Sequence, residues 1–128
     1  MIGTQYGLIA LGGALGAMAR FAVGTWVQSR LPAAIFPWGT FVINVTGSLL
    51  LGFLATLLQA RFLNETIWRP LVTIGFIGAY TTFSTFEYET AQLGSSWRAL
   101  GNLVGSVVVG YGAVWIGIKL GALMLGRK

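Results

Sequence analysis

The stretch GFIGAYTTFSTFEYE, residues 75–89, holds the residue types that could bind an ion. Its four serine and threonine residues fall within five positions: Thr81, Thr82, Ser84 and Thr85. Phe83 and Phe86 are three residues apart and therefore share one face of a helix. The edge of an aromatic ring is electropositive, so two ring edges beside a narrow passage could replace part of an anion's hydration. Packing or lipid contact is the ordinary role of such a pair, but the neighbouring hydroxyls and Glu89 argue against a purely lipid-facing stripe.

The backbone of the same stretch offers a second kind of chemistry. A helix through residues 78–85 would place Gly78 and a run of β-branched and hydroxyl residues in the middle of an apolar segment, where helix propensity is poor. Backbone that is not helical is tolerated at membrane depth only where it is buried in protein or lines a cavity. A break there would free carbonyl oxygens that can coordinate a cation. A kinked but continuous helix is the alternative, and the residues alone leave both open.

Further polar residues repeat at helical spacing in two other apolar segments. Thr40, Asn44 and Ser48 occupy one face of one segment, and Asn102 and Ser106 are four residues apart in another. Such groups usually face a bundle interior or a wet cavity, although hydrogen bonding between helices explains Ser48 and Ser106 equally well. Asn44 is harder to satisfy by chance, because its amide has two donor hydrogens and two acceptor lone pairs.

Arg20 lies in the last third of the first apolar segment. Its side chain could extend to the nearby membrane interface. It could also stand at the mouth of a polar cavity, where its charge would raise the local concentration of anions. The two interpretations are compatible.

Composition excludes most other chemistry. The 128 residues are 55% hydrophobic and 9% charged, against about 25% charged in an average soluble protein. Cysteine and histidine are absent and the only acids are Glu65, Glu87 and Glu89, so a thiolate nucleophile, an imidazole base and a Cys/His metal site are excluded and we do not expect an enzyme. The net charge of +5 comes from scattered cations rather than a basic stripe, so we expect no nucleic-acid partner.

These residues sit in a chain that predicts an all-α integral membrane protein, with residues 1–128 forming a single four-helix transmembrane domain. A helix needs about 20 mainly apolar residues to cross the hydrocarbon core of a lipid bilayer. Four windows qualify: Tyr6–Val27, Trp38–Ala60, Leu71–Leu93 and Ala99–Leu125. The short connections between them indicate a bundle that runs up and down, with its polar stretch at 75–89 inside the third helix.

The orientation of the bundle is weakly specified. One side of the membrane would carry Arg61, Arg69, Lys119, Arg127 and Lys128, and the other Arg20, Arg30 and Arg98. This small bias fits a protein with both termini inside, and it also fits dual topology, in which the same chain inserts both ways and pairs antiparallel. Small residues four apart favour close helix contacts: Gly12/Gly16, Ser48/Gly52, Gly75/Ala79, Gly101/Gly105 and Gly117/Gly121. Four helices offer too few internal interfaces for all of these pairs, so we expect a homo-oligomer.

Three motifs together resemble one known family. GFIGAYTTFSTFEYE resembles the GxxGxxTTFSTF signature of the Fluc (CrcB-type) fluoride channels. FVINVTGSLLLGF in the second window is similar to that family's NxxGSxxxG pattern, and GALGAMARF in the first fits its GAxxR element. The resemblance extends over all four windows, and the TTFSTF string is highly specific.

The resemblance implies passive export of fluoride from the bacterial cytoplasm across the plasma (inner) membrane by a multi-pass antiparallel homodimer with a break in the third helix. It also implies a structural sodium ion held by the main-chain carbonyls of Gly78 and Thr81. The pore residues it implies are Phe83, Phe86, Asn44, Ser84, Thr85 and Ser106, with Arg20 at the vestibule. Asn102 departs from the family, where an aromatic hydroxyl is common one turn before the serine, and Ala79 replaces a frequent glycine. Roles for Tyr111, Glu87 and Glu89 are left unassigned.

Two other function classes compete with a channel. A small four-helix proton-coupled multidrug exporter needs an acid embedded in the membrane, and only Glu87 and Glu89 could serve. A helper subunit that transports nothing would use its polar faces only to bind a partner. Fluoride efflux from liposomes without a proton gradient separates a channel from both.

Overall fold

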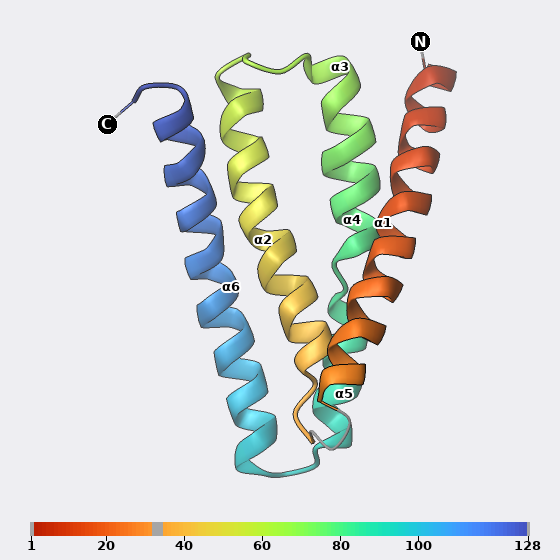
Figure 1. Ribbon diagram of the computed structural model, residues 1–128, viewed down its shortest axis with the longest axis vertical. Coiled ribbons are helices and arrows are strands. Elements are labelled where there is room, and N and C mark those ends of the chain that lie inside the picture. Colours follow the sequence, from red (N-terminus) through yellow and green to blue (C-terminus); the bar gives the residue numbers. More distant parts are fainter. Residues whose placement is uncertain (1, 32–34, 128) are drawn as a thin grey trace.

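The computed structural model describes residues 2–31 and 35–127 and consists of four helical rods (Figure 1). Three are single helices: α1 (Ile2–Arg30), α2 (Trp38–Gln59) and α6 (Trp97–Met124). The other rod is made of α3 (Glu65–Trp68), the π-helix η1 (Arg69–Ile77), α4 (Gly78–Tyr80) and α5 (Phe83–Gln92). The predicted all-α architecture with a break in the third helix is therefore confirmed.

The rods run up and down beside one another. Figure 1 shows both termini and the α2–α3 connection at one end, and the α5–α6 connection at the opposite end. The helices α1, α2 and α6 are long and apolar enough to cross a membrane, with mean hydropathies of 1.5, 2.0 and 1.7 over an 18-residue window in each. Lys128, one of the cations assigned to the end with the termini, lies outside the described residues.

Glycine brings α1 against η1. A Cβ atom on Gly12 would collide with the carbonyl oxygen of Leu71, and one on Gly16 would collide with that of Phe76. The two backbones therefore approach more closely than any larger residue permits, which increases the van der Waals contact that holds helices together in lipid. One of the predicted small-residue pairs thus packs inside the chain.

A second glycine pair joins α2 to α6, while a third is left open. A Cβ atom on Gly117 would meet the carbonyl oxygen of Leu49, and one on Gly121 would meet Thr56 at 2.9 Å. In contrast, a Cβ atom on Gly101 or Gly105 would have nothing within 4 Å among the described residues. As predicted, the contacts within one chain do not use every pair.

The third rod is irregular in two places. The π-helix from Arg69 to Ile77 was not predicted from the sequence; its second residue is Pro70, which has no N–H to donate. Further along, Thr81 (φ −78°, ψ 158°) and Thr82 (φ −151°, ψ 122°) are extended, which separates α4 from α5. The alternative of a kinked but continuous helix is therefore wrong for this chain.

Candidate functional site

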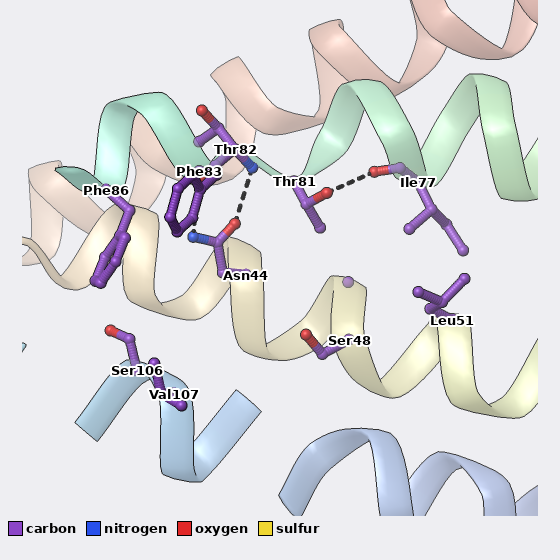
Figure 2. A pocket seen from close by; sticks show the side chains of 11 residues that line it. Asn44, Ser48, Leu51, Ile77, Thr81, Thr82, Phe83, Phe86, Ser106 and Val107 are labelled. Atoms are coloured by element: carbon purple, nitrogen blue, oxygen red, sulfur yellow. Dashed lines mark hydrogen bonds between the residues drawn. The ribbon is translucent and has the colours of Figure 1, made fainter. Parts of the chain in front are cut away.

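The break between α4 and α5 is held by the side chain of Asn44 on α2. Asn44 Nδ2 donates a hydrogen bond to the carbonyl oxygen of Thr82 at 2.9 Å, and the Thr82 amide donates to Asn44 Oδ1 at 2.9 Å (Figure 2). A carboxamide has the same donor and acceptor pair as a peptide group, so it replaces the backbone partner that an extended residue lacks. One N–H of the Asn44 amide is left over by this pair of bonds.

The break also diverts two amide groups from their helical acceptors. In an unbroken helix the Thr82 amide would donate to the carbonyl of Gly78 and the Thr85 amide to the carbonyl of Thr81. Here the first donates to Asn44, and the second donates to the Thr82 hydroxyl at 3.3 Å as the N-cap of α5. The carbonyl oxygens of Gly78 and Thr81 thus lose the donors that a continuous helix would supply, which is the chemistry that a cation site needs.

A cavity of about 270 Å³ lies beside the break, between α2, α5 and α6 (Figure 2). Its polar side chains come from α2, from the break and from α6, while α5 contributes only aromatic rings. The lining residues are Asn44, Gly47, Ser48, Leu51, Ile77, Thr81, Thr82, Phe83, Phe86, Ser106 and Val107. Four of the pore residues implied by the resemblance, Asn44, Phe83, Phe86 and Ser106, are therefore brought together here.

The two phenylalanines share this cavity but differ in environment. Their ring centroids are 5.9 Å apart with the ring planes tilted by 37°. Phe86 is 6% exposed and packs within the chain, whereas Phe83 is 70% exposed. The cavity therefore has one ring fixed by packing and one ring at its open side.

A second cavity, of about 650 Å³, lies between α1, α2 and the start of α5. Its polar lining includes Arg20, Gln28, Ser29, Thr40, Thr82 and Thr85. Thr82 lines both cavities, so the break forms part of the wall between them. The Arg20 side chain lines this second cavity, which agrees with the interpretation of a cation at a vestibule.

A chain of hydrogen bonds links the first cavity to the interior of the α5–α6 contact. Ser106 Oγ donates to Asn102 Oδ1 at 3.1 Å, Asn102 Nδ2 donates to Thr90 Oγ1 at 2.6 Å, and Thr90 Oγ1 donates to the carbonyl oxygen of Phe86 at 2.6 Å. Asn102 is 1% exposed and is the largest fully buried side chain among the residues that the structure describes. The sequence placed Asn102 and Ser106 on one face but gave no signal for Thr90.

The structure leaves the other candidate residues outside the two cavities. Ser84 is exposed on α5 and belongs to neither of the two linings. Tyr111 is exposed on α6, with its ring 6.4 Å from that of Trp115. Glu87 is exposed, and Glu89 has a buried carboxylate oxygen, Oε2, with no hydrogen-bond partner among the described residues.

Comparison with known proteins gives a consistent family. Residues 7–118 match the family described as "CrcB-like protein, Camphor Resistance (CrcB)". A protein named fluoride-specific ion channel FluC from Acidobacterium capsulatum is 50% identical over 120 residues, which cover 91% of this chain and 95% of the relative. The FluC protein of Solibacter usitatus is 47% identical over 119 residues, covering 91% of this chain and 97% of the relative. The chain, a multi-pass membrane protein, therefore belongs to the CrcB-like family.

Proposed function

We propose that this chain is a fluoride-specific ion channel that passively exports fluoride from the bacterial cytoplasm. The observation that carries the proposal is about 50% identity to proteins named fluoride-specific ion channel FluC over most of both chains. The cavity that joins Asn44, Phe83 and Phe86 at a helix break supports it, because donors and ring edges there suit a small anion.

The driving force for export needs no coupled reaction. Hydrogen fluoride crosses lipid as a neutral weak acid and ionises in the less acidic cytoplasm, which traps the anion there. A negative-inside membrane potential then drives fluoride outward through an open pore, by about 2.3 kcal/mol per charge for each 100 mV.

The proposed route joins the two cavities across the wall formed by the break. Arg20 in the larger cavity would raise the local fluoride concentration. Thr85, in the same lining, accepts from the Thr82 hydroxyl at 3.0 Å, so its own hydroxyl hydrogen is available to an anion. In the smaller cavity the leftover N–H of Asn44 and the edges of Phe83 and Phe86 would replace hydration. Ser84 keeps the weakest support, because it lines neither cavity.

A structural sodium ion fits the residues at the break. The carbonyl oxygens of Gly78 and Thr81 have lost their helical donors, and sodium prefers such neutral oxygen ligands. When bound, the ion supplies a positive charge that balances these oxygens. In a symmetric dimer the same two carbonyls from each protomer would face the ion together.

An antiparallel homodimer, with each protomer a single domain of residues 1–128, is the assembly that we propose. Three features support it. The Gly101/Gly105 pair is open on α6, the Phe83 ring is mostly exposed, and the cation bias between the two sides of the membrane is small. A partner would cover the open surfaces and complete the site.

Liposomes loaded with fluoride test the function directly. With a potassium ionophore present and no proton gradient, purified protein should release fluoride and retain chloride. Absence of fluoride release together with drug efflux on acidification would favour the multidrug exporter, and absence of both would favour a helper subunit.

Labelling of the termini tests the assembly. A cysteine introduced at either terminus should be labelled from both sides of the membrane. Labelling from one side alone would refute dual insertion.

A further inference from the structure

The polar chain between Ser106 and Phe86 has a fixed direction. A carbonyl oxygen only accepts, so the Thr90 hydroxyl must donate its single hydrogen to Phe86. Thr90 Oγ1 can then only accept from Asn102, which sets the amide with its NH2 group toward Thr90 and its Oδ1 toward Ser106. Ser106 must therefore donate its hydrogen to Asn102.

This direction decides what Ser106 offers to the first cavity. Ser106 lines that cavity, yet its hydrogen points into the α5–α6 contact and its lone pairs remain on the oxygen. An anion in the cavity meets an acceptor atom there until the hydroxyl rotates and gives up its bond to Asn102. Asn102 and the anion therefore compete for one hydrogen.

We propose that Asn102 is a positioning residue that sets how strongly the cavity binds fluoride, by holding the hydrogen of Ser106. The proposal rests on the proposed channel function. A channel must bind its ion firmly enough to admit it and weakly enough to release it. Asn102 weakens the grip of the cavity without touching the ion, because its side chain is 1% exposed and does not belong to the cavity lining.

The test measures the fluoride concentration that gives half-maximal flux through the full-length protein in liposomes. Asn102→Leu removes the acceptor and keeps the branched shape of the side chain, so the Ser106 hydrogen becomes available to the anion. One net hydrogen bond corresponds to about a three- to ten-fold change in affinity. We therefore expect the half-saturating concentration to fall about three- to ten-fold, with a lower maximal flux as release slows.

A Ser106→Ala background separates this role from packing. If Asn102 acts through Ser106, then Asn102→Leu should not shift the half-saturating concentration in that background. An equal shift in both backgrounds, or no shift in either, would overturn the proposal. Wild-type protein that passes no fluoride would instead refute the channel function itself.

A second variant covers the case in which Asn102→Leu does not fold. Thr90→Val removes the group that orients the amide and leaves the cavity lining unchanged. The half-saturating concentration should fall at least about two-fold, since the amide can then turn its N–H toward Ser106. Thr90→Ser keeps the hydroxyl and should behave like the wild type. An unchanged value in Thr90→Val, or an equal fall in Thr90→Ser, would also overturn the proposal.

Discussion

Replacing Asn44 with alanine removes both hydrogen bonds that hold the extended backbone of Thr82. The Thr82 amide and carbonyl then have no protein partner at these positions. A buried polar group left without a partner costs about 1–3 kcal/mol. The pair is part-buried and borders two cavities, so water can reach it and the lower half of that range applies. Asn44→Ala should therefore destabilise the fold by about 2–4 kcal/mol.

Hydrogen exchange at the Thr82 amide measures the same effect at one atom. Loss of about 1–2 kcal/mol at that N–H should speed its exchange about 5- to 30-fold. Ser48→Ala is the matched control, because Ser48 lines the same cavity from the same helix without a hydrogen bond to the break in the described part of the chain. The control should leave the rate at Thr82 unchanged. Unchanged exchange in folded Asn44→Ala would refute the idea that Asn44 holds the break.

Three further predictions test other parts of the protein. Phe83→Ile and Phe86→Ile should both sharply reduce fluoride flux in liposomes and leave the dimer intact. Truncation to alanine should distinguish the two rings: Phe86→Ala should cost about 3–5 kcal/mol of stability and Phe83→Ala should not, because only the Phe86 ring is buried. Gly117→Ala should lower the stability of the protein in detergent by about 1–3 kcal/mol, because the added methyl group clashes with α2. Gly101→Leu should leave the protomer stable and weaken the association of protomers, measured by size-exclusion chromatography. Arg20→Gln should slow fluoride efflux at low ionic strength, and the difference should shrink near 1 M salt, where the Debye length is about 3 Å.

The helices were predictable because membrane spans depend on apolar length alone. The windows Tyr6–Val27 and Trp38–Ala60 match α1 and α2 to within a few residues. The break was predictable in kind, since the hydroxyl run in residues 78–85 has poor helix propensity. Propensity alone did not locate it at Thr81 and Thr82, because the location depends on Asn44 in another helix; only the family resemblance pointed to the carbonyls of Gly78 and Thr81.

Long-range pairing explains what the sequence could not supply. Asn44 and Thr82 are 38 residues apart, and Asn102 and Thr90 are 12 apart, so no local pattern links them. Spacing alone also treats Phe83 and Phe86 alike, although packing against the rest of the chain buries only one of them. The π-helix η1 has no distinctive composition that predicts it. Gly75 within η1 packs against Gly12 of α1, and this contact between distant residues arises only from tertiary packing.

One rearranged amide connects the two chemistries of the break. When the Thr82 N–H leaves the Gly78 carbonyl for Asn44, it exposes an oxygen that suits a cation and at the same time fixes the residue that separates the two cavities. In the proposed function, sodium would bind the carbonyl oxygen of Gly78, while fluoride would pass Thr82, which Asn44 holds. One hydrogen-bond exchange thus accounts for both proposed ion sites on a single short segment.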